Sequence, residues 1–191
     1  MAAVHALAPS FDTVGWFADG IDTYDRVGAV LLGEDRPGAA LDRMLVAPDI
    51  EALLLGPAEE KAFADGLAII RNHLAAAGTI VVAPGGFDHP RHLIRVIQAF
   101  EVWRAHGEWI ERRRPSFGPG VRERIEWARG VSASEYEQAL ADKAEIRDRL
   151  IDLIGDDTVL VIPTVPSVAP PLGVTGEELE AYRRRAIGML C

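Results

Sequence analysis

The residues that could perform nucleophilic chemistry in this chain are its serines and its two lysines. A serine nucleophile needs a base that accepts its proton, and a lysine can be that base only where desolvation lowers its pKa. Lys61 and Lys143 do not suit this role, because both fall in charge-rich segments with helical patterns. No serine stands in a Gly-Gly-Ser-Ser sequence; the serines are Ser10, Ser116, Ser132, Ser134 and Ser167. We therefore predict no catalytic residue within the chain.

Histidines offer two further kinds of chemistry. His5 or His106 could act as a base for Ser10 or Ser116, but nothing in the sequence pairs them. His89 and His92 lie three residues apart at a predicted helix start and could share a metal ion. No third ligand lies near them, so a capped helix start is the better interpretation.

Cofactor-binding signals are weak. The single cysteine, Cys191, excludes an internal disulfide and a multi-cysteine zinc site. Gly85-Gly86 follows an apolar run, but the lysine and spacing of a phosphate-binding P-loop are absent. We predict no metal and no cofactor.

The charge balance narrows the class of partner. The formal net charge is −9, and phosphate surfaces attract positive fields, so we expect neither nucleic acid nor a membrane as partner. The arginine runs at 112–114 and 183–185 suit solvated helix faces. No apolar run reaches the roughly 18–20 residues that span a bilayer, and residues 1–9 lack the features of a signal peptide. The expected compartment is the cytoplasm.

The elements that must position any site follow from the hydrophobic spacing. It predicts strands at residues 43–47, 79–83 and 159–162. Helical patterns fall between and around the strands, at residues 23–32, 50–55, 58–77, 90–106, 121–129, 132–154 and from 177 onward. This alternation predicts an α/β fold in which helices cover a mixed β-sheet.

The ends of the chain suggest missing neighbours. The last helical pattern runs into the apolar residues 186–191 without a cap or a polar tail, although helices normally satisfy their last carbonyls. The predicted strands are also few for so many helices. We therefore expect a fold that is incomplete at both ends.

Several motifs together resemble the amidase signature family. The sequence Leu-Ala-Pro-Ser-Phe-Asp-Thr-Val-Gly-Trp-Phe-Ala at residues 7–18 is similar to the family's Ser-Phe/Leu-Asp-Thr-x-Gly core. Further similar stretches follow at residues 27–32, at Glu101, at residues 106–110, 115–126 and 159–166, and at Pro170-Pro171. The combination is most similar to the indole-3-acetamide amidase branch.

The resemblance implies that residues 1–191 are the C-terminal-side portion of a single amidase domain with a partial amidase-signature fold. The family hydrolyses carboxamides with a serine nucleophile, a second serine in a cis peptide bond and a neutral lysine base. Backbone N–H groups of a glycine- and serine-rich loop stabilise the oxyanion. These parts precede the Ser-Phe-Asp-Thr segment in the family, and no such sequence precedes Ser10 here. The implied activity is that of an amidase, on a small amide such as an arylacetamide, with the catalytic triad missing from this chain.

The same resemblance assigns supporting roles near the active site to Ser10, Asp12, Thr13 and Gly15. The alternative is a purely structural turn in which Asp12 and Thr13 bond the backbone and Gly15 supplies a permissive conformation.

Candidate residues for lining the acyl pocket are Trp16, Thr164, Val165 and Pro166. The last three belong to the loop at 163–166, which follows an apolar strand and could equally be a rigid surface connection. For Trp16 the alternative is a place in the core, where large aromatic side chains usually lie.

Two classes of function stay open at this point. In the first, the chain is part of an amidase and has a small-molecule amide as its substrate. In the second, it is a non-catalytic protein that pairs with another amidase subunit, or with itself, through exposed sheet edges.

Overall fold

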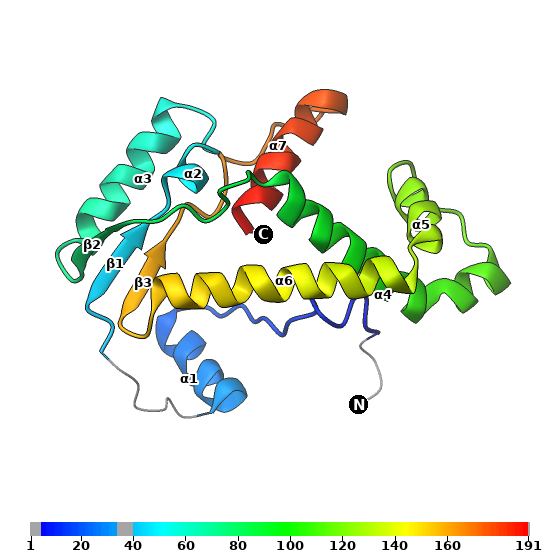
Figure 1. The fold of residues 1–191 in the computed structure, drawn as a ribbon, viewed down its shortest axis with the longest axis horizontal. Coiled ribbons are helices and arrows are strands. Elements are labelled where there is room, and N and C mark those ends of the chain that lie inside the picture. Colours follow the sequence, from blue (N-terminus) through cyan, green and yellow to red (C-terminus); the bar gives the residue numbers. More distant parts are fainter. Residues whose placement is uncertain (1–4, 34–39, 191) are drawn as a thin grey trace.

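The computed structural model describes residues 5–33 and 40–190. Within these ranges the chain forms helices packed around a small sheet (Figure 1). The elements are, in chain order, α1 (Ile21–Leu32), β1 (Arg43–Val46), α2 (Pro48–Glu51), α3 (Pro57–Ile70), β2 (Ala75–Thr79), α4 (Asp88–Arg113), α5 (Val121–Gly130), α6 (Ala133–Ile154), β3 (Thr158–Val161) and α7 (Gly176–Leu190).

The three described strands form one parallel sheet in the order β2-β1-β3. The central strand pairs on both sides, with Met44 opposite Ala76 of β2 and Val159 of β3. The α/β prediction is confirmed, but the described sheet is parallel rather than mixed. The reason is that the connection from β1 to β2 and the connection from β2 to β3 both pass through helices, which carry the chain back to the starting end of the sheet.

The second strand lies four residues earlier than its sequence predicts. The helix α3 ends at Ile70 instead of continuing toward Gly78, and residues 75–79 form β2 instead of residues 79–83. The backbone N–H of Ala75 donates to the carbonyl of Asp42 at 2.7 Å, which starts the pairing with β1. Pairing with a neighbouring strand therefore overrides the helical preference of the alanines. Gly78 lies inside the strand with a φ of 124°, next to a register shift.

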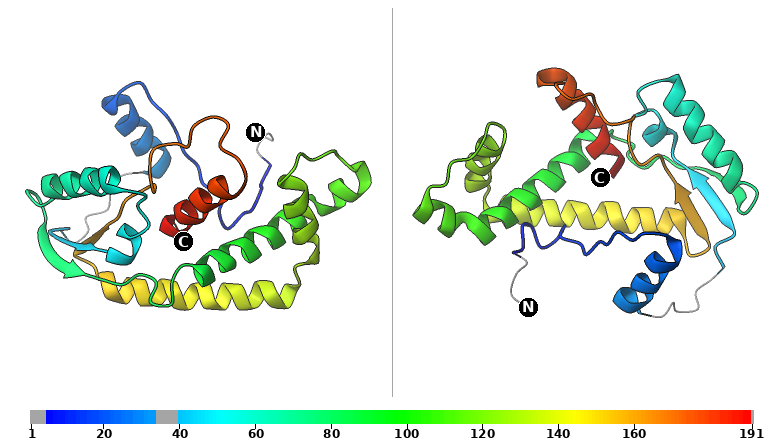
Figure 2. Two further views of the ribbon diagram at one scale, coloured as in Figure 1. Left: turned by 90° about the horizontal axis from the view of Figure 1, so that it is seen from above. Right: turned by 180° about the vertical axis from the view of Figure 1, so that it is seen from behind.

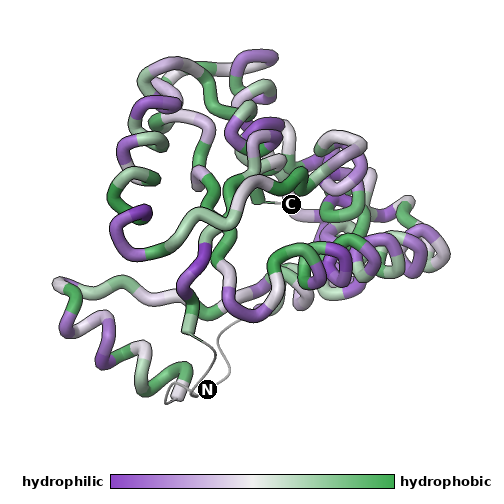
Figure 3. The backbone as a smooth tube through the Cα atoms, turned by 60° about the vertical axis from the view of Figure 1, so that its left-hand side comes forward, coloured by the Kyte–Doolittle hydropathy of each residue, from purple (hydrophilic) through white to green (hydrophobic). Residues whose placement is uncertain are grey.

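Two long helices form the second layer of the molecule. The helices α4 and α6 lie side by side (Figure 2), and the buried residues Leu93, Val96 and Ile97 of α4 pack against Ala139 of α6. Hydrophobic and hydrophilic residues alternate along the helical segments of the tube (Figure 3), as expected for helices with one buried face. The helix α4 continues beyond the predicted end at His106 and stops at Arg113, where Arg114 adopts a left-handed conformation.

The sheet is covered on separate faces by different helices. Met44 and Val46 pack with Leu67 of α3. Ala47, Ile50 and Val82 pack with Met189 of α7. Arg185 of α7 donates to the carbonyls of Leu53 and Leu54 at 3.1 and 3.2 Å. The arginine run at 183–185 is therefore not wholly a solvated face.

The helix α1 differs from the others because none of its residues is buried. Its contacts come from the stretch before it, where Trp16 lies on Tyr24 and Gly28. Within residues 5–33 and 40–190, no helix combines the length and apolar character that a bilayer crossing requires.

Candidate functional site

The segment that carries the Ser-Phe-Asp-Thr motif forms a tight turn stabilised by Asp12. Its carboxylate accepts hydrogen bonds from the backbone N–H groups of Leu7 at 2.9 Å and Ala8 at 3.3 Å. The carbonyl of Ala8 in turn accepts from the N–H groups of Phe11 and Asp12 at 2.8 and 3.0 Å. An aspartate that bonds nearby backbone groups is a common way to fix a turn. In the structure, Asp12 therefore stabilises the backbone of its own turn.

The turn is attached to α4 through Glu101. The side chain of Glu101 is only 7% exposed, and its Oε2 accepts a hydrogen bond from the backbone N–H of Ser10 at 2.8 Å. Its Oε1 accepts from the Ser10 hydroxyl and, at 3.1 Å, from the hydroxyl of Tyr136 on α6. A buried carboxylate is costly unless donors surround it, and here three donors converge on it. One acidic side chain therefore joins the turn, α4 and α6.

Tyr136 shows the electrostatic effect of this arrangement. Burial raises the pKa of Tyr136 above its ordinary value, and the hydrogen bond to Glu101 and the charge of Glu101 raise it further. Its ring also stacks on Phe100, with 4.3 Å between the ring centroids. Tyr136 therefore stays a neutral donor to Glu101 well above neutral pH.

Two more side chains hold the same segment. The ring nitrogen Nε2 of His106 on α4 lies 2.8 Å from the carbonyl oxygen of Ala6. The ammonium of Lys143 on α6 lies over the ring of Phe11, 5.0 Å from its centroid. The segment therefore lies along the α4/α6 pair, where the chain near the N-terminus passes beside these helices in Figure 1.

The other predicted site residues lie apart from Glu101. Thr13 and Gly15 are exposed, and Gly15 does not have a positive φ. The indole N–H of Trp16 donates to the carbonyl of Tyr24 at 3.2 Å, so Trp16 packs on α1. In the loop after β3, Thr164 and Val165 are exposed, whereas Pro166 is buried and its carbonyl accepts from the N–H of Leu55 at 2.9 Å.

Several side chains that could serve as nucleophile or base are engaged in other contacts. The hydroxyl of Ser10 donates to Glu101, and Lys61 donates to Asp65 at 2.6 Å on the exposed side of α3. Ser132 caps α6 through Glu135. The ring nitrogen Nε2 of His89 lies 3.4 Å from Oδ2 of Asp142. In the described ranges, no three histidine, cysteine, aspartate or glutamate residues cluster closely enough to hold a metal ion.

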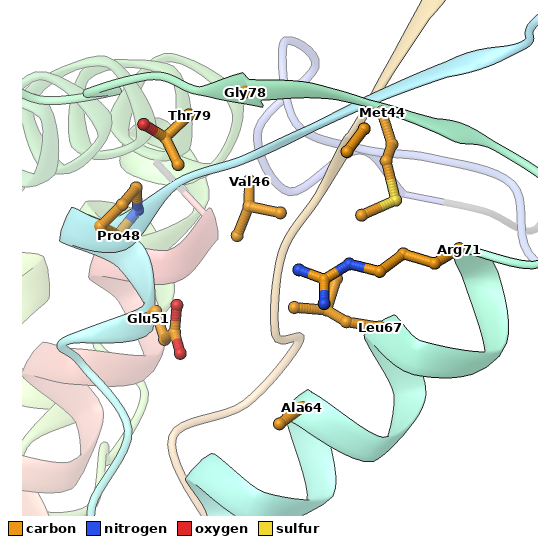
Figure 4. A pocket seen from close by; sticks show the side chains of 10 residues that line it. Met44, Val46, Pro48, Glu51, Ala64, Leu67, Arg71, Gly78 and Thr79 are labelled. Atoms are coloured by element: carbon orange, nitrogen blue, oxygen red, sulfur yellow. The ribbon is translucent and has the colours of Figure 1, made fainter.

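The described part of the chain has surface cavities on two sides of the molecule that could admit a small molecule. The first, of about 410 Å³, lies between α3 and the sheet (Figure 4), with Met44, Val46 and Leu67 as its apolar wall and Glu51 and Arg71 as its charged groups. The second, of about 470 Å³, lies between the end of α4 and α5 and includes Trp103, Phe117 and Arg129. Neither is lined by Trp16 or residues 164–166, so the acyl-pocket role of those residues stays a prediction.

Glu101 is not among the site residues that the sequence predicts. It is one of the positions at which the chain resembles the amidase signature family, but helical spacing gives no sign of a hydrogen-bond partner that is far away in the chain. Ser10 lies 91 residues and Tyr136 35 residues from Glu101. An acidic residue on the buried face of a predicted helix, next to Ile97 and Phe100, is the signal that could have identified it.

The fold defines the class of protein. Over 86% of this chain and 40% of the other, the structure matches a solved amidase with a TM-score of 0.67 and 22% sequence identity. A second solved structure, whose title describes a vestigial protein complex that reveals the evolutionary origins of an s-triazine catabolic enzyme, matches 71% of this chain and 28% of its own with a TM-score of 0.55 and 25% identity. The chain therefore has an amidase-type α/β fold.

Sequence comparison shows similarity to proteins that are named amidases. The chain is 32% identical to Amidase 1 of Arabidopsis thaliana and 28% identical to Amidase 1 of Oryza sativa, in each case over 96% of its length. It is also 28% identical to outer envelope protein 64 of Arabidopsis chloroplasts. No family model matches the sequence. These relatives confirm the resemblance to the amidase signature family, while the indole-3-acetamide branch is not distinguished.

The matches are partial on the side of the relatives. The chain spans 50% and 48% of the two Amidase 1 proteins and 36% of the envelope protein. About half of each Amidase 1 relative therefore has no counterpart in this sequence.

Proposed function

We propose that this chain is the C-terminal-side portion of an amidase domain that hydrolyses the C–N bond of a small carboxamide. The observation that carries the proposal is the 32% identity to Amidase 1 of Arabidopsis over 96% of this chain. In this proposal, the serine nucleophile, the second serine and the lysine base belong to the half of the relatives that the match leaves uncovered.

The contacts of the two lysines support the proposal that the catalytic base lies outside this chain. A lysine base must be desolvated and close to the hydroxyl that it serves. The side chain of Lys61 is 74% exposed and is paired with Asp65, and Lys143 lies over Phe11. Neither lysine is hydrogen-bonded to a serine in the described part of the chain.

The remaining residues take supporting roles in the proposal. Ser10, Asp12, Thr13 and Gly15 support the catalytic loops of the complete site. The loop residues Thr164, Val165 and Pro166, with Trp16, line the acyl pocket, and an arylacetamide such as indole-3-acetamide is the substrate. The similarity of the motifs to the indole-3-acetamide branch supports this substrate, and the proposed compartment is the cytoplasm.

The experiment compares the chain alone with a fusion that adds the uncovered part of Arabidopsis Amidase 1 before it. Ammonia release from indole-3-acetamide and from phenylacetamide is measured for both. We expect no release above background for the chain alone and turnover by the fusion. Turnover by the chain alone at an enzyme-like rate would show that the nucleophile lies within these residues, and a folded but inactive fusion would contradict the amidase proposal.

A non-catalytic partner of another amidase-type subunit is the second candidate function. It is favoured by two relatives that are named for the outer envelope and the outer-membrane translocon of chloroplasts rather than for amide hydrolysis. The described strands β2 and β3 are also edge strands, and edges invite pairing with another chain. Light scattering coupled to size exclusion tests this function: a defined complex with a separately added amidase subunit supports it, and a chain that stays monomeric in the mixture contradicts it.

A further inference from the structure

The most extensively bonded buried side chain outside the apolar cores is that of Glu101. It joins three parts of the chain that are distant in sequence: the turn at Ser10, the helix α4 that carries Glu101, and Tyr136 of α6. We propose that Glu101 and Tyr136 are positioning residues that hold the Ser-Phe-Asp-Thr turn in the orientation needed for amide hydrolysis. The functional part of this inference rests on the proposed amidase function, whereas the holding of the turn does not.

The geometry explains why a carboxylate occupies this position. All three groups that are hydrogen-bonded to the Glu101 carboxylate are donors. The backbone N–H of Ser10 donates to Oε2, and the hydroxyls of Ser10 and Tyr136 donate to Oε1. A carboxylate accepts hydrogen bonds at both oxygens, whereas an amide offers one acceptor and one donor. An apolar side chain at this position would leave the part-buried N–H and hydroxyl of Ser10 without their protein acceptor. Glutamate is thus the side chain that suits this set of donors.

The turn and the carboxylate depend on each other. Release of the turn would remove two of the three donors to the Glu101 carboxylate, and a carboxylate next to an apolar helix interface is disfavoured when it lacks donors. The docked arrangement is therefore favoured from both sides. Ala8, only 1% exposed, and Phe11, which packs with Ile97 and Ala139, add apolar contacts to the same docking surface.

The contacts also define how far the fixed part extends. His106 contacts the carbonyl of Ala6 and Asp12 bonds the N–H of Leu7, so residues 6–12 are held. Residues 13–15 are exposed and carry no such contact to α4 or α6. The four predicted support residues therefore divide into two held ones, Ser10 and Asp12, and two exposed ones, Thr13 and Gly15. We call Glu101 and Tyr136 together the clamp, and it acts on residues 6–12.

Amide hydrogen exchange of the 191-residue chain tests the clamp. In Glu101→Leu, loss of a charge-assisted acceptor should speed exchange at the N–H of Ser10 by about 10- to 100-fold. Exchange in the middle of α4 and α6 should change by less than about threefold. Tyr136→Phe should give a smaller increase at Ser10. Glu108→Gln is the matched control, because Glu108 is an exposed glutamate of the same helix whose carboxylate pairs with Arg112.

A second variant covers the case in which Glu101→Leu does not fold. Glu101→Gln keeps the shape and one acceptor but removes the charge, so it should fold. Absorbance titration at high pH should then show the pKa of Tyr136 lower than in the parent chain, because the nearby negative charge is gone. Ser10→Ala should leave the N–H contact in place and speed exchange less than Glu101→Leu. Unchanged exchange at Ser10 in Glu101→Leu, or an unchanged tyrosine titration in Glu101→Gln, would overturn the clamp.

The positioning role has its own readout in the fusion described above. Glu101→Gln in the fusion should lower kcat by at least about tenfold while KM stays within about threefold, because the turn supports the reacting groups rather than binding the amide. Normal kcat in a variant whose Ser10 exchange is fast would overturn the positioning role and leave the clamp intact. An inactive parent fusion with a normal exchange result would instead contradict the proposed function alone.

Discussion

The indole ring of Trp103 lies directly against Gly107, one helical turn later on α4. A Cβ atom added to Gly107 would lie only 2.8 Å from Cε2 of the ring and 3.0 Å from Cδ2. The guanidinium of Arg129 on α5 lies over the same ring, 5.9 Å from the ring centroid. Gly107 is thus the residue that lets α5 and α4 share the Trp103 side chain.

We expect Gly107→Ala to destabilise the protein in spite of the higher helix propensity of alanine. The propensity gain of about 1 kcal/mol opposes a steric cost of about 1–3 kcal/mol, because the rigid ring must move away from the added methyl group. Urea unfolding should show a net loss of up to about 2 kcal/mol. Gly66→Ala in α3 is the control, because its added Cβ would meet nothing within 4 Å, and it should be neutral or stabilising. A stabilised Gly107→Ala variant would contradict the packing of Trp103.

The start of α6 offers a second prediction. Ser132 accepts a hydrogen bond from the N–H of Glu135 at 3.2 Å, and the carboxylate of Glu135 accepts from the N–H of Ser132 at 2.8 Å. Ser132→Ala should cost about 1 kcal/mol at neutral pH, measured by thermal or urea unfolding. Ser134→Ala is the matched control two residues later, and the two variants should differ; equal stability would argue against the cap.

The same cap makes a prediction for acid pH. Hydrogen bonds from the side chain and backbone of Ser132 lower the pKa of Glu135 in the folded state. The stability that this carboxylate contributes is therefore present above its unfolded pKa, near the ordinary glutamate value, and is lost as pH falls through the lower folded pKa. Stability curves from pH 6 down to pH 3 should fall less steeply in Ser132→Ala than in the parent chain. Parallel curves would contradict the assignment.

Alkaline pH should act on Tyr136. Burial first, and then Glu101, raise its folded pKa above the unfolded value of about 10. The stability that the neutral hydroxyl of Tyr136 contributes to the folded state is therefore fully present below pH 10 and is lost as pH rises through the folded pKa. Unfolding measured between pH 8 and pH 11 should show a steeper decline in the parent chain than in Tyr136→Phe. Tyr24→Phe, at an exposed tyrosine, is the control and should leave the decline in place.

Arg185 should be more important for stability than its place in an arginine run suggests. Its guanidinium bonds the carbonyls of Leu53 and Leu54, and that of Ala52 at 3.5 Å, so it attaches α7 to the end of α2. Arg185→Met should cost about 1–3 kcal/mol, because these carbonyls lose their donor. Arg184→Met, at an exposed neighbour, should cost less than about 0.5 kcal/mol. Equal effects of the two substitutions on the urea midpoint would contradict the contact.

Local patterns predicted those parts of the fold that depend on local forces. The helix at 132–154 has its cap residue and regular apolar spacing in the sequence, and the structure places α6 at Ala133–Ile154. The strand predicted at 79–83 was misplaced, because its β-branched residues gave the stronger local signal. Pairing of Ala75 with Asp42, 33 residues away, decided the position of β2 instead. The hydrogen bonds of Glu101 could not be predicted from local patterns either, because its partners are far away in the sequence and meet it only in the folded chain.

The position of β1 between β2 and β3 has a consequence for synthesis of the chain. Arg43 at the start of β1 and Asp157 just before β3 form an ion pair across 114 residues of sequence. At about 5–20 residues per second, a ribosome needs roughly 6 to 23 s to bring the second residue out after the first. During that interval β1 can pair with β2 but not with β3, so one row of its backbone N–H and C=O groups lacks a partner. One edge of β1 therefore stays exposed to aggregation until β3 emerges, which includes the whole time during which α4, α5 and α6 are being translated.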